Sequence, residues 1–220
     1  MQSREAKYGT VALITSIIAA IGDFAVTTII GLQYKDYNSL TDSQSDLGTF
    51  NSPVAIYMNT WEVLLGLLLL TCAWSLYKTG HFQSGRQKLA LTLLAIYAIG
   101  EGIGSGLFPF NHVNGELTST GWVHSIFSGF GITSMVILSF LLISLFPKKR
   151  SPRLNVLFFF YAVMGAVFIL FCLLSRGNFL HQVGLWQRLY LIAYYAMLIT
   201  LTVYIYRNTS LYSVNRMKQF

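Results

Sequence analysis

Four ionisable side chains lie inside long apolar stretches of this sequence: Asp23, Glu62, Glu101 and His124. Burying such a group costs free energy, and ionisable residues in apolar spans usually face a protein interior or a water-filled cavity. Carboxyl groups beside an imidazole can move protons, because a protonated acid next to an ionised one provides both an acid and a base. These residue types are compatible with catalysis, proton coupling or metal binding, and the pattern alone does not choose among the three.

The stretches that carry these residues are long enough to cross a membrane. The 220-residue chain is 54% hydrophobic and only 10% charged, whereas soluble domains carry about a quarter charged residues. Six segments contain about 20 or more mostly apolar residues, which is the length that a membrane span needs. They are 9–32, 54–77, 88–109, 120–146, 154–175 and 185–206. We therefore predict an all-α polytopic membrane bundle of six transmembrane helices, a single transmembrane domain over residues 1–220.

The basic residues predict the orientation of this bundle. If the amino terminus is cytoplasmic, only Lys35, Arg176 and Arg188 of the 15 basic residues fall outside. The other twelve, including Lys218, then lie in cytoplasmic loops and tails, as the positive-inside rule requires. Both termini are thus expected in the cytoplasm. This placement also explains the formal charge of +7 without nucleic acid as a partner, since no aromatic-basic surface is present.

The polar residues of the first four spans fall at a similar expected depth. With alternating helix directions, Asp23, Glu62 and Glu101 all lie ~12–14 Å below the outer boundary, and His124 lies ~6 Å below it. Gly100 and Gly104 have a small-xxx-small spacing that allows another helix to approach closely. We expect the first four spans to surround one polar site in the outer half of the bundle, open toward the outer face, with the fifth and sixth spans closing the bundle.

The residues around this layer have expected roles. Glu62 and Glu101 are candidates for an acid–base pair, and Asp23 and His124 for orienting or proton-relay groups. Arg188 is expected at the rim, where it would contact an anionic head group. Trp186, Tyr194 and Tyr195 are assigned to the interfacial aromatic belt. The residues expected to contact a substrate are Asn59, Trp61, Tyr97, Asn111, Trp122 and Arg188.

No cofactor is expected from the motifs. Three carboxylates and an imidazole suit manganese, iron or zinc chemically, but no HExxH or HxxxH spacing is present, so no metal site is predicted. Cys72 and Cys172 fall near opposite membrane faces, and we expect both to be unpaired packing residues. The loop 33–53 is rich in turn residues and is either a cover over the site or a mobile connection.

Several motifs resemble those of a known family. The stretches "SDLGTFNSPVAIYMN", "GLFPFN" followed by His124, and "GLWQRL" before the last span resemble the six-helix prokaryotic membrane proteins grouped as domain of unknown function 998. The resemblance covers roughly residues 10–206 and implies a six-span bundle in the cell membrane, the inner membrane of a prokaryote. The family typically has an acid after the Phe-Pro pair, where this chain has Asn111. The resemblance implies no activity.

A shorter likeness concerns the stretch "NTWE", residues 59–62. It is similar to the Asn-x-x-Trp-Glu stretch of membrane-embedded terpene cyclases, which use carboxylic acids to protonate a polyprenyl epoxide. That likeness implies acid chemistry on an isoprenoid.

Three functions remain open from the sequence. The first is an intramembrane enzyme or binding protein for a lipid-like, possibly isoprenoid, molecule, with membrane lipids around it. The second is a proton-coupled transporter of a small molecule, and the third is a structural or accessory membrane subunit. The pattern predicts no oligomeric state.

Overall fold

The computed structural model describes residues 2–177 and 179–217 and forms a bundle of long helices. Five of the six membrane-spanning segments are single helices, and the third is built from three pieces. The helices are α1 (Gln2–Gly31), α2 (Ala55–Lys78), α3 (Gly85–Tyr97), the π-helical turn η2 (Ala98–Gly104), α4 (Ser105–Leu107), α5 (Ser119–Leu145), α6 (Pro152–Arg176) and α7 (Val183–Met217). The predicted all-α bundle with six membrane-spanning helices is therefore confirmed, and the spans agree with the predicted ones within a few residues. Lys218, one of the basic residues expected in the cytoplasm, lies outside the described residues.

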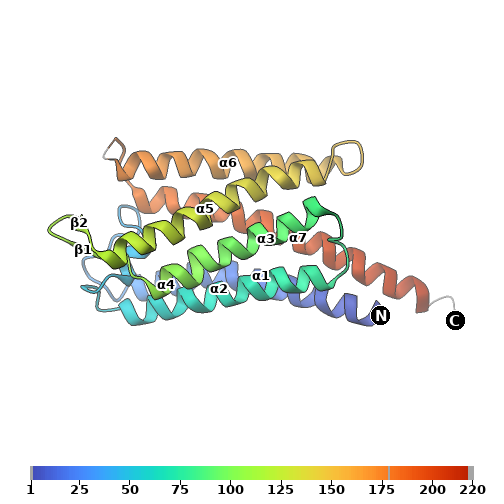
Figure 1. The fold of residues 1–220 in the computed structure, drawn as a ribbon, viewed down its shortest axis with the longest axis horizontal. Coiled ribbons are helices and arrows are strands. Elements are labelled where there is room, and N and C mark those ends of the chain that lie inside the picture. Colours follow the sequence, from blue (N-terminus) through green and yellow to red (C-terminus); the bar gives the residue numbers. More distant parts are fainter. Residues whose placement is uncertain (1, 178, 218–220) are drawn as a thin grey trace.

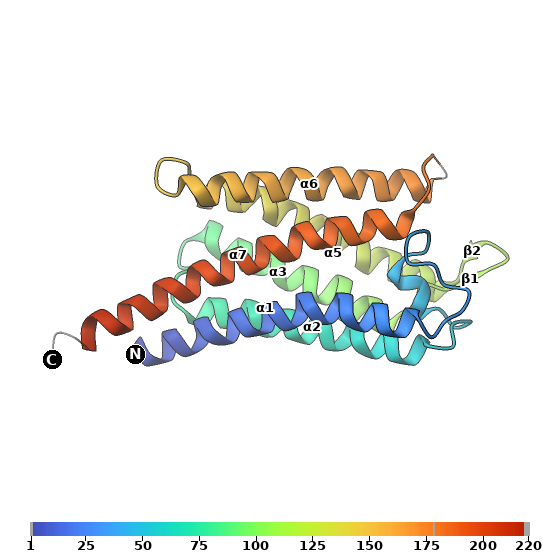
Figure 2. The same cartoon turned by 180° about the vertical axis from the view of Figure 1, so that it is seen from behind.

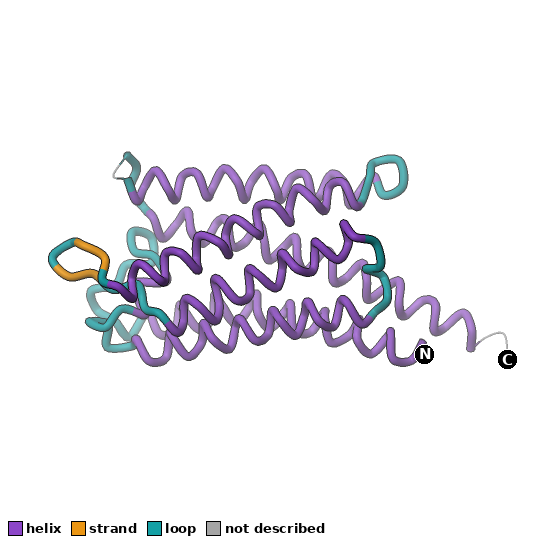
Figure 3. The backbone as a smooth tube through the Cα atoms, in the orientation of Figure 1, coloured by secondary structure: helices purple, strands orange, loops and turns teal. Residues whose placement is uncertain are grey.

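Both chain ends lie at one end of the bundle, as an even number of spans requires (Figures 1 and 2). We call the opposite end the outer end, following the orientation expected from the basic residues. It carries the loop after α1 with its short helix η1 (Gln44–Gly48), and a hairpin of β1 (His112–Val113) and β2 (Glu116–Leu117) (Figure 3).

Local chemistry explains where several of the helices begin. Ser84 and Gln87 form a capping box at α3, in which each side chain bonds the backbone N–H of the other residue. Thr118 accepts a hydrogen bond from the Gly121 N–H at the start of α5. Pro152 begins α6, where its missing N–H costs no helical hydrogen bond.

The third span widens into a π-helical turn around Glu101. The Ser105 hydroxyl donates to the Gly100 carbonyl, five residues earlier, within this wider turn. A Cβ atom at Gly100 would lie 2.5 Å from the Phe127 carbonyl oxygen of α5, so only glycine allows this approach. On the other side, Gly66 of α2 and Gly102 pack backbone against backbone. The predicted close approach at Gly100 is thus confirmed, whereas the π-helical turn was not predicted.

The inner half of the bundle is a packed apolar core. Its buried members include Leu69 and Leu76 of α2, Leu94 of α3, Leu138 and Leu142 of α5 and Phe158 of α6, and each is at most 1% exposed. Cys72 lies in the same core, and both cysteines are unpaired, as predicted. The buried Asp, Glu and His side chains of the spans lie in the outer half instead.

Candidate functional site

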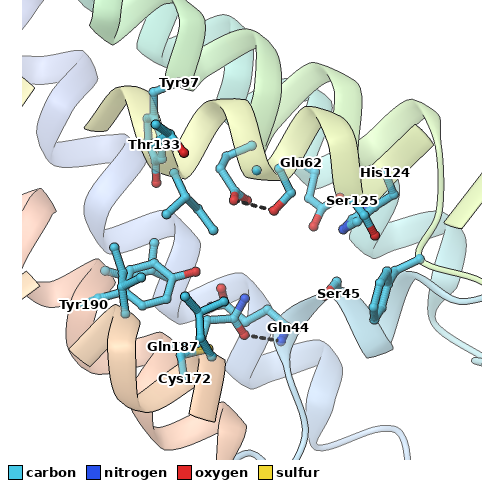
Figure 4. Close-up of a pocket in the computed structure, with 18 of the residues that line it drawn as sticks. Gln44, Ser45, Glu62, Tyr97, His124, Ser125, Thr133, Cys172, Gln187 and Tyr190 are labelled. Atoms are coloured by element: carbon cyan, nitrogen blue, oxygen red, sulfur yellow. Dashed lines mark hydrogen bonds between the residues drawn. The ribbon is translucent and has the colours of Figure 1, made fainter. Parts of the chain in front are cut away.

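A cavity of about 590 Å³ occupies the outer half of the bundle. Asp23 of α1, Glu62 of α2, Glu101 of η2 and His124 of α5 all line it, together with Tyr97. Figure 4 shows Tyr97, Glu62 and His124 on one side of the open space and Tyr190, Gln187 and Cys172 on the other. A cavity of this volume is within the range of pockets that hold small molecules. The structure therefore brings together the four ionisable residues singled out in the sequence.

The fifth and sixth spans do more than close the bundle. Helix α6 contributes Cys172 and Arg176 to the cavity wall, and α7 contributes Gln187, Tyr190 and Tyr195. The expectation that only the first four spans surround the site is wrong, because it rested on charged residues and neglected tyrosine and glutamine. The assignment of Tyr194 and Tyr195 to the aromatic belt is also wrong, since they are 1% and 3% exposed.

Glu62 carries the carboxyl group that is most available to a ligand. The residue is only 8% exposed and lines the cavity. Among the described residues no hydrogen bond engages this carboxyl group, and the carboxyl groups of Glu101 and Asp23 lie close enough to interact with it electrostatically. A buried polar group without a partner costs free energy, so a molecule in the cavity that bonds Glu62 would recover that cost.

Glu101 and Asp23 are, by contrast, held by neighbouring side chains. Oε1 of Glu101 accepts a hydrogen bond of 2.6 Å from the Ser128 hydroxyl of α5. Oδ2 of Asp23 accepts from the Tyr195 hydroxyl at 2.9 Å, and Oδ1 accepts from Nε1 of Trp61 at 3.4 Å. Asp23 thus has a protein donor on each oxygen, whereas Glu101 has a donor on one oxygen.

His124 is oriented by the backbone after the third span. Its Nδ1 lies 2.9 Å from the Phe108 carbonyl oxygen. Because a carbonyl can only accept, Nδ1 carries the hydrogen, and Nε2 of a neutral ring is left as an acceptor. The ring lies 5.1 Å from that of Phe110, another residue of the cavity wall.

The loop after α1 forms a cover over the outer end of the cavity, which we call the outer cover (residues 37–48). The Gln44 N–H donates to Oε1 of Gln187 at 2.7 Å, and the Gln44 side chain donates to Thr27 at 3.1 Å. Leu47, which belongs to this cover, is fully buried. Of the two roles left open for this loop, the structure supports that of a cover.

Arg188 holds this cover in place and does not line the cavity. Its guanidinium donates to the Ser39 carbonyl at 2.7 Å and to the Tyr37 hydroxyl at 2.6 Å. Burial raises the pKa of Tyr37 above its usual value, although Arg188 opposes this shift, so the phenol stays neutral at physiological pH and its oxygen can accept. The cation in the cavity wall is instead Arg176, which the sequence reasoning had assigned only to the outer loop.

Most of the residues that we expected to contact a substrate do not line the cavity. Asn59 donates to the Gly48 carbonyl at 3.0 Å, and Asn111 accepts from the Phe50 N–H at 2.9 Å, so both fix the outer loops. Trp61 packs against Gly22 and bonds Asp23, while Trp122 is 61% exposed. Of the six expected contact residues, only Tyr97 lines the cavity.

The sequence reasoning missed Gln44, Ser45, Cys172, Arg176, Gln187 and Tyr190 in the wall. Gln187, Tyr190, Leu191 and Tyr195 recur at helical spacing along α7, and this spacing was the available signal. No sequence pattern indicated Gln44 and Ser45, because they belong to a loop and line the cavity only where that loop folds back over the bundle. Within the described ranges, no three His, Cys, Asp or Glu side chains lie close enough to hold a metal ion.

These features define a multi-pass membrane protein with a cavity of mixed polar and apolar lining in the outer half of a six-helix bundle. The family model "Protein of unknown function (DUF998)" matches residues 17–204. Since the match covers most of the chain, the protein belongs to this family. Comparison with curated proteins and with solved structures finds no match.

Proposed function

We propose that this protein is an intramembrane enzyme that binds an amphipathic, lipid-like molecule in the outer-half cavity and acts on it by acid–base chemistry. Glu62 and Glu101 form the acid–base pair in this proposal. We also place the protein in the cell membrane, the inner membrane of a prokaryote, with its termini in the cytoplasm. Isoprenoids are one class of molecule that combines a polar group with a long apolar chain, as the cavity would require.

The observation that carries this proposal is the carboxyl group of Glu62, which is buried, faces the cavity and has no hydrogen-bond partner among the described residues. A water-filled site would solvate it, but much of the surrounding wall is apolar, with Leu65, Ile132, Val136 and Leu191 in contact with the same space. A ligand that combines polar groups with an apolar chain satisfies both parts of this wall.

The neighbouring groups support separate roles for the two glutamates. Ser128 holds Glu101 through one oxygen, which favours a fixed carboxyl group that accepts or donates one proton. Nε2 of His124 is the acceptor that a relay needs, while Asp23 keeps the Tyr195 hydroxyl and the Trp61 ring in position. Positioned acid–base groups accelerate reactions by about 10²–10⁴-fold.

The packing beneath the cavity favours this role over proton-coupled transport. Leu69, Leu76 and Leu142 are 0–1% exposed in the inner half, and polar groups buried there include uncharged hydroxyls such as those of Ser16 and Thr202, which bond each other. A proton path would need ionisable groups or an opening there. An accessory role would require only that the polar layer fixes helix register. Such a role provides no reason for a cavity of about 590 Å³ around an unpaired carboxyl group.

Native mass spectrometry with lipid extraction tests the proposal on wild-type protein in mild detergent. Glu62→Gln removes the acid at nearly constant volume, and Glu116→Gln makes the same change on the exposed hairpin. Wild type and Glu116→Gln should retain one class of amphipathic molecule that folded Glu62→Gln loses. The molecule so identified is then incubated with wild type and Glu101→Gln, and only wild type should convert it. Equal retention by all three proteins would contradict the proposal.

A further inference from the structure

The outer cover closes part of the outer end of the cavity, and residues of α5 and α6 that line the cavity are exposed on the side of the bundle. The outer cover is tied to α7 through Gln44 and Gln187 and through Ser39 and Arg188. Gln44 and Ser45 of the cover are themselves buried in the cavity wall. A ligand that entered past the cover would have to break these contacts.

The opening lies between α5 and α6. Several residues of these two helices line the cavity and are at the same time exposed on the outside of the bundle, as Ile137 at 49% and Leu173 at 60% illustrate. In both views the two helices are close at their inner connection and separate toward the outer end (Figures 1 and 2). We call this region the side opening, and its residues are Gly129, Thr133, Ile137, Ile169, Leu173 and Arg176.

Gly129 leaves the part of the side opening nearest the outer end of α5 free of side-chain atoms. A Cβ atom built on Gly129 would meet nothing within 4 Å, unlike one on Gly131 of the same helix, which would lie 2.8 Å from the Glu101 nitrogen. Gly129 is therefore not required for helix packing. It lies ten residues after the start of α5, roughly 15 Å below the outer end at 1.5 Å per residue, at the depth of lipid chains.

Arg176 lies at the shallow end of the same opening. It is the last residue of α6, is exposed, and lines the cavity. Its guanidinium lies 5.0 Å from the centre of the Phe110 ring, a cation–π distance that holds the side chain near the cavity mouth. A fixed guanidinium at the membrane boundary is suited to a phosphate or carboxylate, which it can bind through two N–H groups.

We propose that the side opening admits a membrane lipid with an anionic head group, whose chain passes between α5 and α6 while Arg176 binds its head. This inference rests on the proposed function, because it names the ligand class and the route for the same cavity. The arrangement of the protein matches the orientation of a lipid in the outer leaflet. The cation lies at the boundary, the gap in the wall lies deeper, and the buried carboxyl group of Glu62 lies beyond the gap.

Photolabelling in lipid nanodiscs tests this route. The probe is hexadecyl phosphate with a diazirine near the chain end, and the comparison probe is hexadecyltrimethylammonium with the same diazirine. Brief illumination followed by peptide mapping measures how fast label appears on cavity residues such as Ile132 and Leu191, which line the cavity. Inorganic phosphate in excess shows whether the free anion competes with the lipid head.

Two variants close the opening from opposite sides: Gly129→Trp on α5 and Leu173→Trp on α6. Phe130→Trp is the matched control, since Phe130 is 68% exposed and does not line the cavity. We expect both closing variants to slow cavity labelling several-fold and the control to leave it unchanged. If one closing variant fails to fold, the other still tests the route from the second helix. Arg176→Gln should reduce labelling by the phosphate probe several-fold and leave the ammonium probe unchanged.

Three results would overturn the inference: cavity labelling at wild-type rate in both closing variants, equal labelling by both probes, or full competition by inorganic phosphate. Failure here is distinguishable from failure of the proposed function. Suppose that Glu62→Gln loses the lipid, but that labelling of the cavity in Gly129→Trp and Leu173→Trp proceeds at the wild-type rate. The proposed function would then stand, and only the proposed route would be overturned.

Discussion

The Ser128 hydroxyl donates a 2.6 Å hydrogen bond to Oε1 of Glu101, from α5 to the π-helical turn of the third span. Gly100 and Gly131 lie beside this bond and allow the two backbones to come close. The bond and the glycines explain how an acidic residue is accommodated in the membrane. Glu101 faces a cavity, has one fixed donor, and keeps its other oxygen free of protein hydrogen bonds within the described residues.

Removing that donor should destabilise the bundle by a modest amount. We expect Ser128→Ala to lower the free energy of unfolding by about 0.6–1.7 kcal/mol, the range measured for hydrogen bonds between membrane helices. Thermal unfolding in detergent measures the change. Ser144→Ala is the control, because Ser144 bonds only the Leu141 carbonyl of its own helix and should cost little. Equal effects of the two variants would argue against a special role for the bond to Glu101.

The close contact at Gly100 predicts a larger loss. In Gly100→Ala the new methyl group would lie 2.5 Å from the Phe127 carbonyl oxygen, and overpacking of this kind costs about 1–3 kcal/mol. Gly129→Ala, where nothing lies within 4 Å of the methyl group, should be neutral or slightly stabilising. The midpoint of thermal unfolding compares the two alanine variants, and a destabilised Gly129→Ala would show that the wall between α5 and α6 is closed.

The outer cover should loosen when its contact with α7 is removed. Gln187→Ala deletes the acceptor of the Gln44 N–H, and the loss of one hydrogen bond of about 0.5–1.5 kcal/mol corresponds to roughly 2- to 10-fold faster opening. Hydrogen–deuterium exchange of residues 38–48 measures this rate. Gln33→Ala provides the comparison, since that side chain is exposed and bonds only Ile29. Unchanged exchange in Gln187→Ala would mean that other contacts hold the cover.

The two cysteines should differ in reactivity. Cys172 lines the cavity, whereas Cys72 is 0% exposed in the inner core. A small apolar thiol reagent should therefore modify Cys172 in the Cys72→Ser protein several times faster than Cys72 in the Cys172→Ser protein. The ligand found by mass spectrometry should protect Cys172 alone. Rates that are equal in both proteins, or protection of Cys72, would place the ligand elsewhere.

The expected orientation can be checked with single cysteines in a Cys72→Ser/Cys172→Ser background. Asn114→Cys lies in the hairpin at the outer end, and Ser151→Cys lies in the loop before α6 at the end that carries the termini. An impermeant maleimide should label Asn114→Cys in intact cells or spheroplasts and label Ser151→Cys only after lysis. The reverse pattern would place the cavity in the cytoplasmic leaflet.

Sequence patterns predicted the spans and the polar layer because both depend on composition and helical spacing alone. Asp23, Glu62, Glu101 and His124 were conspicuous as ionisable groups in apolar helices, and all four line the cavity. The loop residues Gln44 and Ser45 were not predictable, because their positions depend on how a loop folds back over the bundle. The π-helical turn could not be predicted from the sequence either, because it depends on the contacts of Gly100 with α5 and of Gly102 with α2.

Arg188 illustrates why the role of a charge is harder to predict than its location. Near the start of the last span it has the sequence features of a ligand contact, yet its guanidinium is occupied by Ser39 and Tyr37 of the outer cover. Arg176 instead lies at the cavity wall, 5.0 Å from the centre of the Phe110 ring. The difference comes from the path of the connecting loops, which local sequence does not specify.

The most direct test of the central claim is a high-resolution structure of wild-type protein in lipid nanodiscs, determined by electron cryomicroscopy with a bound antibody fragment, beside Glu62→Gln. The account predicts an elongated density in the wild-type cavity, within hydrogen-bond distance of the Glu62 carboxyl group and weaker or absent in the variant. A cavity that holds only separate water molecules in both proteins, or that neighbouring side chains fill, would contradict the claim.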